Sequence, residues 1–163
     1  MFKSDKIVLK LKGYVDSDFA GNSDNRKSTT AYFYVLNNTC ICWKSQLQKL
    51  VALSSTEAEY IAVTEAVKEG LWLLGLLNEL QLVEKQVELC FDNQSVIFLS
   101  RNPVHDRTKH IDVKFHFIRD IVERSDITLV KIPTKVNHAD ARTKVIPINK
   151  FLDSLRLLNL DTF

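Results

Sequence analysis

Glycine and proline are scarce in this sequence, with only four and three copies among 163 residues. Flexible linkers are rich in these residues and in serine, so their scarcity excludes a set of modules joined by such linkers. No internal repeat is present either. Because 163 residues suffice for one hydrophobic core, we expect a single domain over residues 1–163.

Long apolar runs are also missing. No segment approaches the roughly 20 apolar residues that a membrane helix needs, and the first ten residues, MFKSDKIVLK, lack the features of a secretory signal peptide. The composition, 45% hydrophobic and 26% charged, is ordinary for a globular protein. We therefore expect an intracellular, cytoplasmic protein with no membrane partner.

A large charge of one sign is absent as well, since 22 Lys and Arg residues face 20 Asp and Glu residues and leave a net charge of +2. Any nucleic-acid site must therefore be argued from local side chains. The three cysteines are an odd number, and Cys40 and Cys42 alternate along a predicted strand. This favours buried free thiols in a reducing compartment over a disulfide framework or a zinc site.

Three predicted strands open the chain. Apolar and polar residues alternate over 6–16 and predict a strand that ends near Asp16. The aromatic and β-branched segments 31–36 and 40–45 are separated by a short Asn-rich turn, which predicts a hairpin.

Helices and strands then alternate. Residues 54–80 have a helical pattern, with a break or shift expected near Gly70 and Gly75. The later predicted elements are a strand over 86–92, helices over 93–101 and 110–123, a strand over 127–133, a short helix over 137–144 and an amphipathic helix over 148–160. This order predicts an α/β fold in which helices cover a mixed sheet whose first three strands are antiparallel.

Four carboxylates lie at the ends of these elements. Asp16 and Asp92 end strands, Glu59 lies near the start of the long helix, and Asp140 lies near the start of a late helix. Ligand sites in open α/β sheets gather at strand ends. Neighbouring carboxylates raise one another's pKa and persist most easily when divalent cations such as Mg²⁺, which prefers oxygen ligands, neutralise them. The four acids are therefore candidate metal ligands.

Each acid also has a purely structural interpretation. Asp92 can cap the helix that follows it. Asn137 can cap the late helix, which leaves Asp140 in a first turn where its charge suits the helix dipole. Asp16 and Asp18 can be turn residues after a strand. Capping and metal binding are compatible, so the pattern leaves both interpretations open.

The neighbouring acids Glu57 and Glu59 differ in their expected roles. Ser54 and Glu57 fit the capping box S-x-x-E, in which the serine caps the helix and the glutamate reaches back to the serine's backbone N–H. Steps of three and four residues from Glu59 meet an unbroken stripe of apolar and small residues, whereas the same steps from Glu57 meet a mostly polar face. We therefore expect Glu59 to point towards the sheet and Glu57 to serve the helix start.

A carboxylate that points towards the sheet needs a partner, because an unpaired buried charge is expensive. A metal ion shared with Asp16 and Asp92 is one partner for Glu59. Lys44, Lys49 or a backbone amide is the alternative.

Four segments of the sequence, in the order found in one family, carry a closer resemblance. They are GYVDSDFAGNSDNRKSTTAYFYVL (13–36), WKSQLQKLVALSSTEAEYIAVTEAVKEGLWLLGLL (43–77), DNQSVIFLSRNPVHDRTKHIDVKFHFIRD (92–120) and NHADARTK (137–144). Together they resemble the ribonuclease H domain of copia-type LTR retrotransposon polyproteins, from the reverse transcriptase/ribonuclease H region. The resemblance runs from about Leu11 to Leu160.

This resemblance implies the ribonuclease H fold, a five-stranded mixed sheet with three antiparallel strands first and flanking α-helices. It implies an endonuclease that hydrolyses the RNA strand of RNA–DNA hybrids during reverse transcription. By motif, Asp16, Glu59, Asp92 and Asp140 would be the catalytic residues and the ligands of two Mg²⁺ ions, for which Mn²⁺ can substitute. Such ion pairs activate a water and stabilise the leaving oxygen.

The implied partners are the RNA–DNA hybrid and the adjacent reverse transcriptase domain of the same polyprotein, and the implied location is a retrotransposon particle in the cytoplasm. The sequence departs from many relatives in two places. Val104 directly precedes His105 without an extra residue, and Ala31 replaces a common glycine. Some ribonucleases H use a loop histidine for product release, but neither His110 nor His138 matches that motif well.

A hybrid must be held mainly through its phosphates and its RNA 2′-hydroxyls. Basic and hydrogen-bonding residues in the relevant loops and strands are candidates for these contacts. They are Arg26, Lys27, Ser28, Lys44, Ser45, Asn93, Gln94, Arg107, Lys109 and His110. Trp43 and Trp72 are expected in the core rather than stacked on bases.

Two other functions compete with hybrid cleavage. One is a catalytically weak or inactive module that binds nucleic acid or packs against a polymerase. The other is a different nuclease or strand transferase on the same fold, such as an integrase. Integrases tend to place a glutamate last among their acids, whereas the order here is Asp, Glu, Asp, Asp, which favours ribonuclease H.

Overall fold

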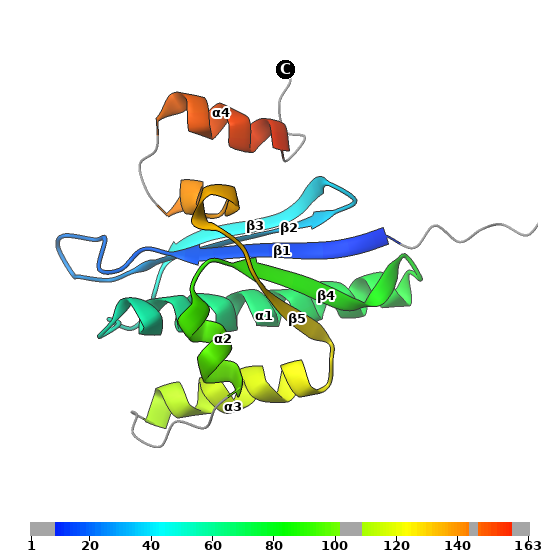
Figure 1. Cartoon of the computed structure of the whole chain (residues 1–163), viewed down its shortest axis with the longest axis horizontal. Coiled ribbons are helices and arrows are strands. Elements are labelled where there is room, and N and C mark those ends of the chain that lie inside the picture. Colours follow the sequence, from blue (N-terminus) through cyan, green and yellow to red (C-terminus); the bar gives the residue numbers. More distant parts are fainter. Residues whose placement is uncertain (1–8, 102–108, 144–146, 158–163) are drawn as a thin grey trace, which may run out of the picture.

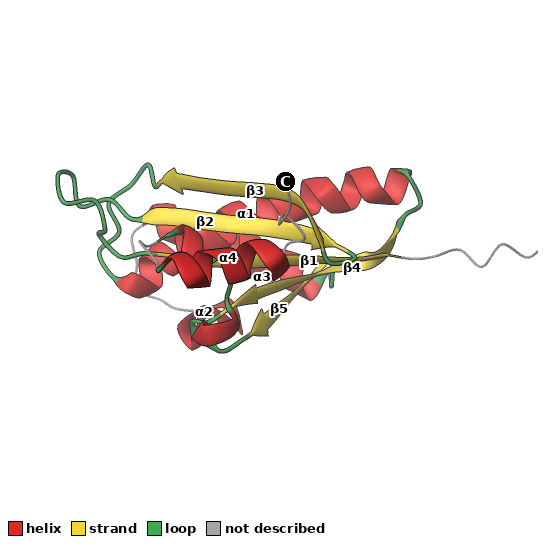
Figure 2. Cartoon of the chain, turned by 90° about the horizontal axis from the view of Figure 1, so that it is seen from above, coloured by secondary structure: helices red, strands yellow, loops and turns green. Residues whose placement is uncertain are grey.

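The computed structural model describes residues 9–101, 109–143 and 147–157. Their strands form one five-stranded sheet with the order β3-β2-β1-β4-β5 (Figure 2). The strands are β1 (Leu9–Ser17), β2 (Thr29–Leu36), β3 (Thr39–Leu47), β4 (Val83–Phe91) and β5 (Ile127–Lys131). β1, β2 and β3 pair antiparallel, while β4 is parallel to both β1 and β5. The predicted mixed sheet with three antiparallel strands first is confirmed.

The turn between β2 and β3 follows from two asparagines. Asn37 and Asn38 both have positive φ, at 49° and 66°. A two-residue hairpin loop with positive φ at both positions matches the twist of the flanking strands, and asparagine tolerates this conformation well. The predicted hairpin forms here, with strands that extend beyond the predicted ranges at both outer ends.

Three helices cover one face of the sheet (Figure 1). They are the long α1 (Ser55–Glu79) and the shorter α2 (Gln94–Arg101) and α3 (Lys109–Glu123). Helix α1 packs against β1, β2 and β4. The core between these layers is built from fully buried apolar side chains, among them Val63, Leu89 and Ile118. Apolar surface removed from water in this layer is the main source of stability.

Helix α1 runs unbroken for 25 residues, so the break expected near its glycines is wrong. Gly70 instead lets the helix approach β2 closely. A Cβ at this position would lie 2.6 Å from the Tyr34 hydroxyl oxygen, and that hydroxyl donates a 2.5 Å hydrogen bond to the Ala66 carbonyl. A Cβ added at Gly75 would have no neighbouring heavy atom within 4 Å, and this glycine does not interrupt the helix.

The opposite face of the sheet carries the C-terminal elements η1 (Thr134–Val136), η2 (Asp140–Arg142) and α4 (Ile148–Leu157) (Figure 1). The Tyr14 and Phe33 rings stack with centroids 4.9 Å apart, and the Arg142 guanidinium lies 5.3 Å from the Phe33 ring. Ala139 is fully buried against the same cluster. These contacts place η2 over the end of β1.

The short helix predicted over 137–144 is only the three-residue 3₁₀ turn η2. Because η2 begins at Asp140, its N-cap residue is Ala139, and the cap expected at Asn137 lies two residues too early. The Asn137 side chain instead donates to the Val15 carbonyl at 3.0 Å and accepts from the Ala139 N–H at 3.2 Å. This side chain therefore ties the turn to β1.

Two predicted core residues lie at the surface. Trp43 on β3 and Trp72 on α1 are each 62% exposed, which corrects the expectation of burial. The three cysteines are free, as expected, but only Cys90 is fully buried, while Cys40 and Cys42 are half-buried. In the described part of the chain, no helix has both the length and the apolar character of a membrane span.

Candidate metal centre

Three of the four predicted acids meet at one end of the sheet, where β1 and β4 end and α1 begins. Asp16, Glu59 and Asp92 each present one carboxylate oxygen, and these oxygens lie within 4.8 Å of one another. Asp16 and Glu59 are buried, at 2% and 7% exposure, and Asp92 is half-buried. Residues 76 positions apart in sequence are thus brought into one cluster by the parallel pairing of β1 and β4.

The start of α1 brings Glu59 to this cluster. The Ser54 hydroxyl accepts the Glu57 N–H at 3.1 Å and caps the helix. The Glu57 carboxylate reaches back as expected, although it accepts from the N–H of Leu53, at 2.8 Å, rather than from that of Ser54. With its carboxylate occupied there, Glu57 supports the helix start, and the helical twist turns Glu59 towards Asp16.

Only part of the expected contrast between Glu57 and Glu59 is confirmed. Glu57 is 6% exposed and therefore as buried as Glu59. Part of the α1 face below it, predicted to be mostly polar, is covered by α3, with the Tyr60 and Phe115 rings 4.0 Å apart, whereas Lys68 on the same face stays exposed. The two acids differ in their partners rather than in their burial.

Glu59 lacks a partner for one of its oxygens. Its Oε2 is buried and has no hydrogen-bond partner among the described residues. Burial, followed by the negative charges of Asp16 and Asp92, raises the pKa of Glu59 to about 8. A hydrogen bond from the Ser17 backbone N–H, the kind of backbone-amide partner considered for Glu59, opposes this shift only in part. A buried acid cluster with an orphaned oxygen fits a divalent cation.

Asp92 is available to this cluster because its neighbour performs the capping. The Asn93 side chain accepts the Ser95 N–H at 2.9 Å at the start of α2. The alternative in which Asp92 caps this helix is therefore wrong.

A similar division separates Asp16 from Asp18. The Asp18 carboxylate accepts the backbone N–H of Thr29 and so closes the β1–β2 connection. Asp18 does not belong to the three-acid group, which agrees with the choice of Asp16 by motif.

Asp140 is held near the cluster but does not belong to it. It starts η2, is half-buried, and lies outside the group defined by the 4.8 Å separation. The Thr143 hydroxyl links the two parts, since it donates to Asp16 Oδ2 at 2.5 Å and lies 3.1 Å from the Asp140 carbonyl oxygen. Thr143 was missed by sequence reasoning, although it belongs to the motif NHADARTK that located Asp140.

The structure describes the side chain of one of the two histidines considered for product release, His138. The His138 ring lies against Tyr14, with centroids 5.8 Å apart, and burial lowers its pKa. The side chain of His110 lies outside the described residues.

The candidate nucleic-acid residues occupy several places around the cluster. Arg26 is exposed and Lys27 half-buried in the connection that follows Asp16. This connection is ordered by its own backbone, because the Asn22 N–H donates to the Lys27 carbonyl at 3.1 Å and the Arg26 N–H to the Asn22 carbonyl at 2.9 Å. Its basic side chains therefore project from a fixed loop.

Other candidates already have intramolecular partners. Ser45 is exposed and donates to the Arg142 carbonyl at 3.0 Å, while Lys44 beside it on β3 is half-buried. The exposed Gln94 accepts from Lys131 at 3.0 Å, and Asn93 caps α2. Arg107 lies outside the described residues, and Lys109 begins α3 with its side chain outside them.

The prediction that Ser28 contacts a nucleic acid is wrong. This residue is fully buried, and its hydroxyl accepts the Ala20 N–H at 3.0 Å. A buried side chain with this role shapes the β1–β2 connection and does not reach a nucleic acid.

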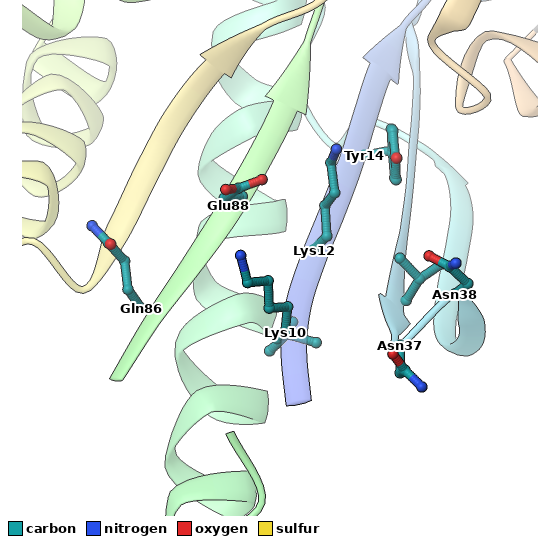
Figure 3. Close-up of a pocket in the computed structure, with 9 residues that line it drawn as sticks. Lys10, Lys12, Tyr14, Asn37, Asn38, Gln86 and Glu88 are labelled. Atoms are coloured by element: carbon teal, nitrogen blue, oxygen red, sulfur yellow. The ribbon is translucent and has the colours of Figure 1, made fainter. Parts of the chain in front are cut away.

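A surface hollow of about 530 Å³ lies elsewhere on the molecule. Figure 3 shows its side chains on the sheet face turned away from α1, with Lys10 and Lys12 on β1 facing Glu88 on β4. None of the four predicted acids lines it. The hollow is therefore separate from the carboxylate cluster.

Comparison with known sequences gives relatives of one kind. The chain is 53% identical over 142 residues to the retrovirus-related Pol polyprotein from transposon TNT 1-94 of Nicotiana tabacum, covering 86% of this chain and 11% of that protein. It is 40% identical over 147 residues to the corresponding polyprotein from transposon RE1 of Arabidopsis thaliana, with 88% and 10% covered. The chain spans about a tenth of the length of these relatives. No family model matches the sequence.

Solved structures show the same fold. The N-terminal RNase H domain of a Mycobacterium tuberculosis protein superposes with a TM-score of 0.61 at 11% identity, covering 91% of this chain and 97% of that one. LC11-RNase H1 in complex with an RNA/DNA hybrid gives 0.59 at 19% identity, with 88% and 99% covered. The foamy viral protease-reverse transcriptase gives 0.56 at 15% identity, with 93% of this chain and 21% of that one covered.

The strand order, the position of the acid cluster and these superpositions define a ribonuclease H-fold domain. Its homologues are the retrovirus-related Pol polyproteins of transposons, and the chain corresponds to a ribonuclease H domain within such a polyprotein. The family resemblance carried by the four sequence motifs is thereby confirmed.

Proposed function

We propose that this domain is a copia-type retrotransposon ribonuclease H that hydrolyses the RNA strand of RNA–DNA hybrids during reverse transcription. The observation that carries this proposal is the convergence of Asp16, Glu59 and Asp92 within 4.8 Å. Two of the similar solved structures contain an RNA/DNA hybrid, which supports the choice of substrate. A cytoplasmic retrotransposon particle is the location we propose.

The residues present fit Mg²⁺ or Mn²⁺ in three respects. All ligands on offer are carboxylate oxygens, which these hard cations prefer. Glu59 Oε2 is buried without a hydrogen-bond partner. The mutual repulsion of three close acids also disappears when a cation neutralises them. When bound, two such ions supply an activated water and a counter-charge for the leaving oxygen.

The protein's own part is to hold the ligands in place. Asp16 lies between the two halves of the site, because it joins the Glu59–Asp92 group and accepts the Thr143 hydroxyl. Glu59 and Asp92 would hold one ion and Asp140 the other, and Asp16 would contribute to both. Arg26 and Lys27, on the ordered loop after Asp16, are assigned to phosphate contacts.

The test is cleavage of a labelled RNA–DNA hybrid, compared with duplex RNA and duplex DNA, in Mg²⁺ or in EDTA. We expect hybrid-specific cleavage that EDTA abolishes. Asp92→Asn should lower the rate by more than about 100-fold, beyond the usual effect of losing an outer partner of a metal ligand. Its folding should be unharmed, since one of three mutually repelling charges is removed. The matched control is Asp120→Asn, at an exposed position on α3.

A wild-type rate in Asp92→Asn would contradict the assignment of this acid. An inactive isolated domain has two explanations, which the same assay separates when the polymerase region is supplied. Activity restored by that region indicates weak substrate binding by the isolated domain. Continued inactivity, with hybrid bound, would favour the alternative function of a binding or polymerase-packing module.

A further inference from the structure

The hydroxyl of Thr143, the residue that follows η2, contacts the Asp16 carboxylate on β1 at the candidate metal centre. Thr143 immediately follows η2, and its backbone N–H donates to the Asp140 carbonyl at 3.3 Å. Its Oγ1 lies 2.5 Å from Asp16 Oδ2 and 3.1 Å from the same Asp140 carbonyl oxygen. One side chain therefore contacts the carboxylate of Asp16 and the backbone carbonyl of Asp140, two residues that lie far apart in the sequence.

The hydroxyl has a single proton to donate, and two acceptor oxygens lie within reach of it. The carboxylate of Asp16 is the closer and the charged acceptor, so it takes the stronger hydrogen bond. This bond restrains rotation of the Asp16 carboxylate. Asp16 is 2% exposed, so water has little access to replace the bond.

Threonine suits this position better than a freely rotating residue. Its β-branch restricts χ1, so the hydroxyl stays directed once the backbone is set. The backbone is set independently, because Ala139 is buried against Phe33 and Val35 and the Asn137 side chain donates to the Val15 carbonyl. The hydroxyl is thus held against Asp16 by a turn that is itself tied to β1.

We propose that Thr143 is a positioning residue of the metal centre, whose hydroxyl orients the Asp16 carboxylate from the turn that carries Asp140. This role rests on the proposed function in that it assumes a divalent cation at these acids. Because Asp140 lies outside the 4.8 Å group, its place beside the cluster depends on the turn that Thr143 connects to Asp16.

The experiment compares wild type, Thr143→Val and Thr143→Ser by calorimetric titration with Mn²⁺ and by hybrid cleavage. Valine has the shape of threonine without the hydroxyl, whereas serine retains it. We expect Thr143→Val to weaken Mn²⁺ binding and to lower kcat by about 10- to 100-fold, the usual effect of losing an outer partner of a metal ligand. KM for the hybrid should change little, and Thr143→Ser should recover most of both losses.

The matched control is Thr128→Val on β5, which removes a threonine hydroxyl that accepts a hydrogen bond from Gln86 at an exposed position away from the acids. It should leave Mn²⁺ affinity and kcat unchanged. Thermal unfolding of every variant checks the fold, and if Thr143→Val does not fold, Thr143→Ala replaces it.

Three results would overturn the proposal. They are Mn²⁺ binding and kcat at wild-type levels in the variant without the hydroxyl, equal losses in Thr143→Ser and Thr143→Val, and a wild-type chain that binds no Mn²⁺. Mn²⁺ binding that depends on the hydroxyl, in a chain that cleaves no hybrid, would instead refute the proposed function and retain the role of Thr143.

Discussion

Replacing Glu59 with Gln should abolish activity and, without metal, make the protein more stable. The glutamate has a raised pKa of about 8 because it is buried and lies beside Asp16 and Asp92. In the unfolded chain the same group has its ordinary pKa, near 4.5. Glutamine is neutral at every pH and nearly isosteric, so the substitution removes the cost of this ionisation and little else.

The sign and size of the effect follow from these two pKa values. Below pH 4.5 the group is neutral in both states and contributes nothing. As the pH rises, the unfolded chain loses the proton first, so the folded state becomes relatively less stable until about pH 8. At 1.36 kcal/mol per pH unit, the loss reaches about 3 kcal/mol at pH 7 and about 5 kcal/mol above pH 8. Glu59→Gln should recover an amount of this order.

The assay is urea unfolding in EDTA at pH 5 and pH 8, repeated at pH 8 with Mn²⁺. The gain in unfolding free energy of Glu59→Gln over wild type should be small at pH 5 and several kcal/mol at pH 8. Mn²⁺ should stabilise the wild type, because it binds the folded state, and should stabilise the variant much less. Hybrid cleavage by the variant should be undetectable.

Glu57→Gln is the matched control, two residues away and equally buried. It keeps an acceptor for the Leu53 N–H but loses the charge at the helix start, so it should cost about 0.5–1 kcal/mol at both pH values and leave cleavage intact. A wild type that is more stable than Glu59→Gln at pH 8 in EDTA, or a difference that does not change with pH, would refute the reasoning about the buried acid.

Two further predictions concern packing. Gly70→Ala should lower the unfolding free energy by about 1–3 kcal/mol, because the new methyl group would meet the hydrogen-bonded Tyr34 hydroxyl at 2.6 Å, whereas Gly75→Ala, with open space around it, should raise it by about 1 kcal/mol through helix propensity. Urea unfolding measures both, and equal effects at the two sites would contradict the close approach of α1 to β2. Trp43→Ala should change stability by less than about 0.5 kcal/mol, since the side chain is 62% exposed, and a loss of several kcal/mol in the same assay would show that it is buried.

The sheet and the three-acid cluster were predictable because they depend on patterns that repeat along the chain. Alternation and turn residues locate strands, and the order of strands and helices limits the topology. Once β1 and β4 are parallel neighbours, the acids at their ends must be close. Glu59 followed from counting along one helix, which needs no knowledge of distant contacts.

The errors arise where a second layer or a distant partner decides. The face of α1 that carries Glu57 has polar residues, yet α3 covers the part of it around Tyr60, and nothing in the helical pattern signals that contact. The aromatic character of Trp43 suggested the core, but β3 is an edge strand and its outer face is left exposed. The assignment of the α2 cap to Asp92 failed by one residue, a difference smaller than the accuracy of predicted helix ends.

Thr143 illustrates the limit most clearly, because its hydrogen bond to Asp16 joins residues 127 positions apart. The motif that contains it identified Asp140 as the functional residue, and the threonine three positions later carried no separate signal. In the structure Thr143 contacts the Asp16 carboxylate directly, whereas Asp140 lies outside the three-acid cluster. The fourth acid is therefore carried by a short 3₁₀ turn, which the Asn137 side chain and the buried Ala139 hold against the sheet, and not by a strand or a long helix. Substitutions in this turn should consequently alter metal binding more readily than they alter the stability of the fold.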